Sequence, residues 1–104
     1  MATIDLIDQC KRILENYYGN QFYGLILYGS VARNQATTES DIDLLVLLSK
    51  PFDYFGELYR IVDLLYPVQL ESNQLISAKP ASLDEYERGT IQQYRNAKRE
   101  GIAV

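Results

Sequence analysis

Histidine is absent from this chain of 104 residues. Without an imidazole the chain can form neither a Ser-His nor a Cys-His nucleophile pair, and it cannot form a His-ligated zinc site. Any chemistry must therefore depend on carboxylates, hydroxyls, lysine and arginine. This set of groups favours magnesium-dependent phosphate chemistry, in which positioning and charge neutralisation do most of the work.

Cysteine and long apolar runs are also scarce. Cys10 is the only cysteine, which excludes an intrachain disulfide, and its place among the apolar positions of a predicted helix favours a role in the core. Asp5 and Asp8 interrupt the first apolar stretch, which argues against a signal peptide. No apolar segment approaches the roughly 20 residues that span a bilayer. We therefore expect a soluble, cytoplasmic protein without membrane contact.

Length and charge restrict the organisation further. A chain of 104 residues with 47% hydrophobic content is expected to form one domain, residues 1–104, around one core. We find no linker, repeat or low-complexity segment. The net charge of −4 argues against direct contact with nucleic acid and suits a basic partner.

Apolar spacing in the first half predicts a helix followed by two strands. The helical stripe ends at Gly19, a natural C-terminal stop. Compact apolar runs predict strands over residues 22–28 and 41–48, the second ending before Lys50 and Pro51. A short helix over residues 30–34 and a polar loop over residues 35–39 separate the two strands. The stripe of the first helix consists of Ile4, Ile7, Cys10, Ile13, Leu14 and Tyr17.

The second half predicts helix, strand and helix. Asp53 caps a helix that Pro67 ends near Tyr66, and a third strand follows over residues 68–77. Ser82 and Glu85 form a capping box for a last helix. The inward positions of these two helices are Phe55, Leu58, Val62 and Leu65, then Leu83, Tyr86, Thr90, Ile91 and Tyr94. Strands that alternate with helices indicate an α/β fold, a small sheet covered by helices.

Two carboxylates open the second strand, at Asp41 and Asp43. Alternate side chains of a strand share a face, so both should point the same way. Charges beside a buried strand are costly unless something compensates them. Two carboxylates one pleat apart can bind a hard divalent cation such as Mg²⁺ through oxygen. The alternative is a solvated strand end without function.

Gly29 and Ser30 follow the first strand. A glycine at a strand end lets the backbone approach a ligand closely. Ser30 then begins a helix whose free N–H groups and positive dipole end favour a phosphate. If the two strands pair, a phosphate held there projects toward Asp41 and Asp43, which predicts a metal–nucleotide site. A turn with a simple N-cap is the alternative.

The segment "GSVARNQATTESDIDLLV" resembles the signature of the nucleotidyltransferase superfamily that includes the DNA polymerase beta fold. The pattern is Gly-Ser, a spacer from Val31 to Ser40, and Asp-x-Asp. The resemblance is strongest to the minimal nucleotidyltransferases and extends over almost the whole chain. It implies a polymerase beta-like core with a small mixed sheet. It also implies transfer of a nucleoside monophosphate, typically AMP from ATP, to a hydroxyl.

The resemblance also implies a role for individual residues of this chain. The resemblance assigns Gly29 and Ser30 to the triphosphate, and Asp41 and Asp43 to Mg²⁺ in a two-metal arrangement. Arg33 corresponds to an arginine that family members often carry, so it is either a phosphate contact or a solvated helix charge. The resemblance also assigns Ser40, the last spacer residue, to nucleotide binding.

The superfamily usually adds a third carboxylate from a later strand. Within the strand predicted over residues 68–77, Glu71 is the only acidic residue on one face, so we nominate it as a catalytic residue and metal ligand. If Gln69 or Asn73 lies at the site instead, only two carboxylates remain.

The resemblance also implies a partner. Minimal nucleotidyltransferases are commonly antitoxins that silence HEPN-domain ribonuclease toxins by adenylylating a toxin tyrosine, so we expect a hetero-oligomer with a cognate HEPN toxin. One alternative is a non-catalytic antitoxin that masks the toxin, with some of the nine tyrosines at the interface. Another is a nucleotidyltransferase that acts on a small-molecule hydroxyl.

Overall fold

A computed structural model of the chain describes residues 3–29 and 41–104, which form an α/β fold. The described helices are α1 (Thr3–Tyr18), a 3₁₀ turn η1 (Gly19–Gln21), α3 (Tyr54–Glu71), α4 (Leu83–Arg88) and α5 (Gln92–Glu100). The strands are β1 (Phe22–Tyr28), β2 (Ile42–Leu48), β3 (Ile76–Ser82) and β4 (Ile102–Ala103). The predicted fold class is thereby confirmed.

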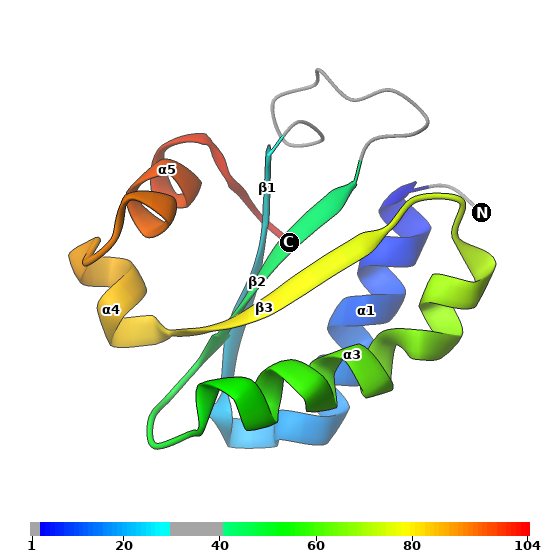
Figure 1. The fold of residues 1–104 in the computed structure, drawn as a ribbon, viewed down its shortest axis with the longest axis horizontal. Helices are drawn as coiled ribbons and strands as arrows, with labels where there is room; N and C mark the ends of the chain where they lie inside the picture. Colours follow the sequence, from blue (N-terminus) through cyan, green and yellow to red (C-terminus); the bar gives the residue numbers. More distant parts are fainter. Residues whose placement is uncertain (1–2, 30–40) are drawn as a thin grey trace.

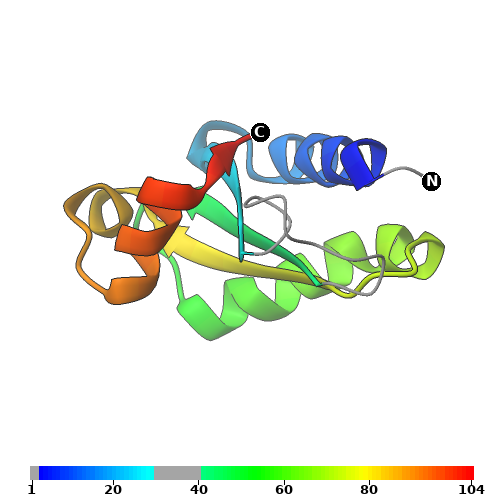
Figure 2. The same cartoon turned by 90° about the horizontal axis from the view of Figure 1, so that it is seen from above.

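The four strands form one mixed sheet in the order β3-β2-β1-β4. β2 pairs antiparallel with β1 and parallel with β3, and β4 pairs antiparallel with β1. Helices α1 and α3 lie on one side of the sheet, and α4 and α5 lie on the other (Figure 1). The view from above shows the twisted strands between these helices (Figure 2). None of the described helices is both long and apolar enough to cross a membrane.

Both faces of β2 are buried, which explains its nearly continuous apolar sequence. Leu44 and Val46 pack in the core formed with α1 and α3. Leu45 and Leu47 pack in the core formed with α4 and α5. Because successive side chains of a strand alternate between its faces, Asp43 shares the α4–α5 face with Leu45.

Helix α1 ends before Gly19, as predicted. Its buried stripe differs slightly from the predicted one, because Ile4 and Tyr17 are exposed while Leu6 and Tyr18 are buried. The residues on the core side of α1 are spaced four apart along the helix. Ile4 and Tyr17 lie at the margins of that side and are therefore exposed. The positions of β1 and β2 agree with the prediction to within one residue.

Pro67 does not end the helix that Asp53 caps. The Asp53 carboxylate accepts a hydrogen bond from the Gly56 N–H at 2.8 Å, and α3 continues through Pro67 to Glu71. Val68 lies on the buried face with Ile61 and Leu65. Interior proline costs about 3 kcal/mol, and the burial of a further apolar side chain offsets much of that cost.

Two further predictions for this region are therefore wrong. The third strand covers Ile76–Ser82 rather than residues 68–77. Phe55 and Val62, predicted to face inward, are exposed on α3, because the buried face is centred on Ile61 and Leu65. Of the other two positions predicted to face inward, Leu65 is buried and Leu58 is half-buried.

The predicted last helix is two helices. Ser82 caps α4 by accepting a hydrogen bond from the Glu85 N–H at 3.3 Å, as predicted. Gly89 then adopts a left-handed conformation with φ of 63° and ends α4. Thr90 and Ile91, predicted on the inner stripe, lie in the exposed connection to α5.

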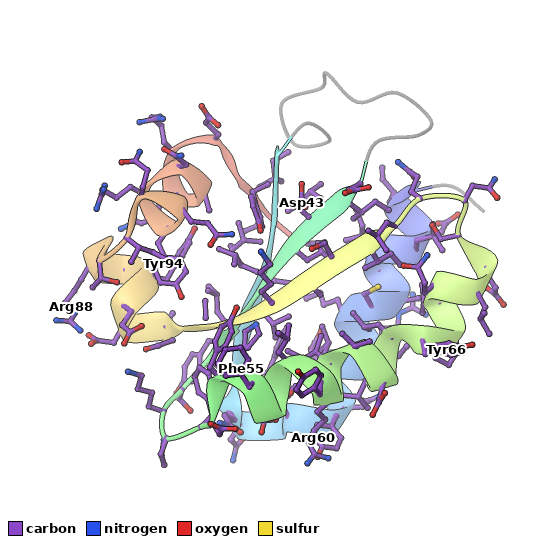
Figure 3. All side chains as sticks on the ribbon, in the orientation of Figure 1. Asp43, Phe55, Arg60, Tyr66, Arg88 and Tyr94 are labelled. Atoms are coloured by element: carbon purple, nitrogen blue, oxygen red, sulfur yellow. The ribbon has the colours of Figure 1, made fainter. Side chains whose placement is uncertain are left out.

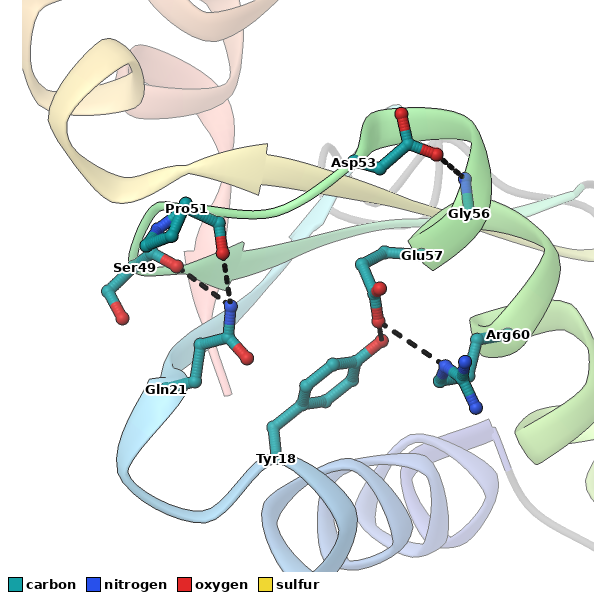
Figure 4. A network of polar contacts seen from close by, with 8 residues as sticks. All are labelled: Tyr18, Gln21, Ser49, Pro51, Asp53, Gly56, Glu57 and Arg60. Atoms are coloured by element: carbon teal, nitrogen blue, oxygen red, sulfur yellow. Dashed lines mark hydrogen bonds and ion pairs between the residues drawn. The ribbon is translucent and has the colours of Figure 1, made fainter.

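A polar network closes the end of the sheet at which β1 begins (Figure 4). The Gln21 side-chain amide donates to the carbonyl oxygen of Ser49 at 2.9 Å. The Tyr18 hydroxyl donates to Glu57 at 2.9 Å, and Arg60 pairs with the same carboxylate at 3.6 Å. These contacts join α1 to α3 and η1 to the connection between β2 and α3.

Candidate active site

The end of β1 meets the start of β2. Tyr28 is the register partner of Asp43, so the strands pair in the way that the metal–nucleotide hypothesis requires. Gly29 follows with φ of 79°, a conformation that glycine adopts at little cost. A Cβ at Gly29 would overlap the Asp43 carboxylate oxygen Oδ2 and lie 3.3 Å from its Cγ. Glycine is therefore needed here both for the backbone conformation and for space.

Asp43 and Asp41 form an acidic pair. Asp43 is half-buried, Asp41 is exposed, and Ile42 between them is buried toward α1 and α3. Burial raises the pKa of Asp43, and the neighbouring Asp41 charge raises it further, whereas Lys79 lowers it. The two carboxylates are thus close enough to repel each other. Such a pair is stabilised by a cation.

The neighbouring strand β3 supplies no acid to this pair. Ser77 is the register partner of Asp43, and Lys79 follows two residues later on the same face. The sequence of β3, "ISAKPAS", contains neither Asp nor Glu. Within residues 3–29 and 41–104, no group of three or more His, Cys, Asp or Glu residues is arranged to hold a metal ion.

The expected strand position of Glu71 is wrong. Glu71 is the last residue of α3 and is exposed. The two alternatives also lie outside a strand. Gln69 is in α3, where its side chain donates to Gln74 O at 3.0 Å and accepts from Ile76 N at 2.7 Å, and Asn73 is in the connection to β3. The cause is the same helix extension past Pro67 that displaced the strand.

Three nominated residues lie outside the described part of the chain. These are Ser30, Arg33 and Ser40, together with the predicted helix over residues 30–34 and the loop over residues 35–39. Their assignment to the nucleotide stays a prediction.

Lys79 and Ser77 were missed at the level of sequence. Because the third strand was predicted over residues 68–77 rather than Ile76–Ser82, neither residue could be placed opposite Asp43. The signal was present, because Ser77 and Lys79 alternate with Ile76, Ala78 and Pro80. That period of two would have placed Ser77 and Lys79 on one face of a strand, although only the register with β2 puts that face beside Asp43.

A cavity adjoins Gly29. It has a volume of about 400 Å³ and is lined by Tyr28, Gly29, Gln93, Asn96 and Glu100. The Gln93 amide donates a hydrogen bond to the Tyr28 hydroxyl at 2.9 Å. Helix α5 thus forms one wall beside the end of β1, which gives a ligand at Gly29 a polar neighbour that the sequence did not indicate.

Comparison with solved structures supports the fold. A spectinomycin adenyltransferase of Enterococcus faecialis, solved with ATP and spectinomycin, superposes with a TM-score of 0.76 at 20% identity, over 99% of this chain. This chain spans 56% of that enzyme. A candidate nucleotidyltransferase of Sulfolobus solfataricus superposes with a TM-score of 0.63 at 17% identity, over 96% of this chain and 79% of that one.

Sequence comparison identifies the family. A candidate protein adenylyltransferase of Methanocaldococcus jannaschii is 37% identical over 77 residues, which are 70% of this chain and 77% of the relative. Residues 7–98 match the family described as nucleotidyltransferase domain. That match contains the end of β1, the Asp pair and most of α5. The chain belongs to the nucleotidyltransferase domain family, and it is a transferase enzyme.

Proposed function

We propose that this chain is a protein adenylyltransferase that transfers AMP from Mg-ATP to a tyrosine hydroxyl of a cognate HEPN-domain ribonuclease toxin, and so acts as its antitoxin. The observation that carries the proposal is the juxtaposition of Gly29 and Asp43 in a nucleotidyltransferase chain. The name of the relative from Methanocaldococcus jannaschii supports a protein as the acceptor. The HEPN partner follows from the resemblance to minimal nucleotidyltransferases.

The acidic pair fits a magnesium ion. Asp41 and Asp43 offer hard oxygen donors. Burial raises the pKa of Asp43 and the charge of Asp41 raises it further, and a divalent cation would offset both effects. When bound, Mg²⁺ neutralises phosphate charge and orients the attacking hydroxyl. The cavity of about 400 Å³ that Gly29 lines would give a phosphate room near the pair. Lys79 adds one positive charge on the same face.

The proposed reaction is a displacement at the α-phosphorus of ATP. The acceptor oxygen forms a bond to this phosphorus, the bond to the oxygen bridging to the β-phosphate breaks, and pyrophosphate leaves. The hydroxyl proton passes to a carboxylate of the acidic pair or to water. On the toxin, the product is a bulky anion, which would repel RNA phosphate from a ribonuclease site by charge and size.

A second candidate function is masking of the toxin without catalysis. It is favoured by the composition of β3, which brings Ser77 rather than an acid beside Asp43. Transfer to a small-molecule hydroxyl ranks lower, because the enzyme that acts on spectinomycin shares only the fold with this chain.

The mass of the partner protein after incubation distinguishes adenylylation from the two alternative functions. The chain is incubated with ATP, Mg²⁺ and the product of the neighbouring gene, which we expect to be a HEPN-domain protein, and that product is then weighed. We expect an added AMP that disappears with Asp41→Asn and with Asp43→Asn. Neutralisation that persists in both variants without added mass would establish masking. ATP consumption with free hydroxyl compounds and no protein partner would establish the small-molecule reaction.

A further inference from the structure

Lys79 of β3 lies beside the acidic pair. β3 runs parallel to β2, with Ser77 opposite Asp43 and Lys79 opposite Leu45. Lys79 is therefore a diagonal neighbour of Asp43 in the sheet. Diagonal neighbours lie about 7–8 Å apart, which is within reach of a long side chain. The lysine ammonium can thus approach the Asp43 carboxylate.

Packing shows that Lys79 and Asp43 share one face of the sheet. Leu47 and its register partner Ala81 both pack in the core formed with α4 and α5. Alternate residues of a strand share a face, so Lys79 lies on the same side as Ala81. Asp43 lies on that side with Leu45, which packs in the same core. No part of the sheet separates the lysine from the carboxylate.

The end of this face that carries the acidic pair is only partly covered. Leu45 and Ala81 are buried beneath α4 and α5, whereas Asp43, Ser77 and Lys79 are half-buried. Figure 3 labels Asp43 near the start of β2 and Tyr94 on α5. Because β2 lies between β1 and β3, a ligand at Asp43 would have the end of β1 on one flank and Lys79 on the other.

The charge of Lys79 acts on Asp43. Burial raises the pKa of Asp43, the Asp41 charge raises it further, and the Lys79 charge lowers it. Within residues 3–29 and 41–104, Lys79 nevertheless forms no ion pair. A half-buried charge is costly unless something compensates it. The phosphates of a nucleotide would supply the compensating negative charge.

β3 offers this positive charge where the family resemblance implies a third metal-binding carboxylate. Ser77 stands opposite Asp43, and the strand contains neither Asp nor Glu. In a two-metal site, the second ion helps to neutralise the charge on the transferred and leaving groups. A lysine ammonium binds phosphate as a point charge, so it can supply the same neutralisation without a third carboxylate.

We infer that Lys79 is a catalytic residue whose ammonium contacts the triphosphate of ATP and supplies, from β3, positive charge that a second metal ion would otherwise supply. This inference rests on the proposed function. When the bond from the α-phosphorus to the bridging oxygen breaks, its electron pair stays with pyrophosphate. Lys79 would offset the negative charge that builds up there. The lysine keeps its proton throughout, so the route of the acceptor's proton is unchanged.

The test uses Lys79→Met, which removes the charge and keeps a long unbranched side chain. Calorimetry measures binding of Mg-ATP, and electron paramagnetic resonance measures binding of Mn²⁺ alone. We expect Mg-ATP to bind about tenfold more weakly or worse, because a charged contact to phosphate is lost. Mn²⁺ alone should bind at least as tightly as to the wild type, because a repelling charge beside the acidic pair is removed. Lys79→Arg, which keeps the charge, should retain most of the Mg-ATP affinity.

Lys11→Met is the matched control. Lys11 is half-buried like Lys79, and its replacement changes the net charge by the same amount. It belongs to α1, on the opposite side of the sheet from Asp43, so both affinities should match the wild type. Circular dichroism verifies the fold of each variant. Lys79→Gln repeats the measurement if the methionine variant does not fold.

Unchanged Mg-ATP affinity in Lys79→Met would overturn the inference. Weaker binding of both Mg-ATP and Mn²⁺ would also overturn it, because Lys79 would then act only by positioning the acidic pair. Equal losses in Lys11→Met would reduce the effect to net charge and exclude a contact. Failure of the proposed function appears differently, as a wild type that binds Mg-ATP but adds no AMP to the product of the neighbouring gene.

Discussion

The carboxylate of Asp43 occupies the space that a side chain at Gly29 would need. The two residues are 14 positions apart in the sequence, and the antiparallel register of β1 and β2 brings them together. The backbone of Gly29, which carries no side chain, and the carboxylate of Asp43 thus lie together at one end of the sheet. The absence of a side chain at Gly29 is what allows the Asp43 carboxylate to lie against the end of β1.

The first prediction concerns Gly29→Ala. The new Cβ would displace Asp43, and alanine at positive φ adds about 1–2 kcal/mol of strain. Because a displacement of about 1 Å can cost about 10²-fold in rate, we expect AMP transfer to fall by roughly that factor, measured from the rate of pyrophosphate release. Gly19→Ala is the matched control, since φ there is also positive but no atom lies within 4 Å of the added Cβ. Equal activity losses in the two variants would show that backbone strain alone is responsible.

The second prediction separates the acidic pair from Glu71. Asp43→Asn should weaken Mg²⁺-dependent ATP binding by at least about tenfold, because hydrogen-bonding amides replace charged oxygen donors poorly at a hard cation. Glu71→Gln should leave this binding unchanged, since Glu71 ends α3. Isothermal titration with Mg-ATP measures both. A comparable loss in Glu71→Gln would restore Glu71 as a metal ligand and contradict the two-carboxylate site.

The third prediction concerns Pro67→Ala. Pro67 is exposed inside α3, and interior proline is about 3 kcal/mol less favourable than alanine. The replacement should raise the free energy of unfolding by about 1–3 kcal/mol, measured by urea denaturation. Pro67→Gly should gain about 1 kcal/mol less than the alanine variant. Destabilisation by both variants would mean that the chain needs a break at this position.

The fourth prediction concerns the buried thiol of Cys10. Burial raises its pKa from 9.0 to about 11, partly opposed by a backbone hydrogen bond. The folded chain then retains a proton that the unfolded chain releases, so stability is retained below pH 9 and decreases as the pH rises toward 11. The loss should be about 2 kcal/mol. Denaturation of wild type and Cys10→Ala at pH 8 and pH 10.5 measures it, and the same decrease in both would exclude Cys10 as the cause.

Several features could be predicted because they are local. The run from Phe22 to Tyr28 and the run ending at Leu48 are compact and apolar, so their strands were located to within one residue. Capping by Asp53 and Ser82 depends on neighbours three residues away. The prediction that Pro67 ends the helix is wrong because a contact far away in the sequence decides this position. Proline disfavours a helix locally, and only the burial of Val68 against the sheet shows why the helix continues.

The sequence by itself determined the chemistry available to this protein. It contains an Asp-x-Asp pair at the mouth of one apolar run, a Gly-Ser step at the end of another, and no histidine. Tertiary structure decided which groups meet. The hydrogen-bond register sets Gly29 against Asp43 and Ser77 beside it, while helix packing leaves Glu71 outside the sheet. Register and packing join segments far apart in the chain, so a local pattern cannot encode them.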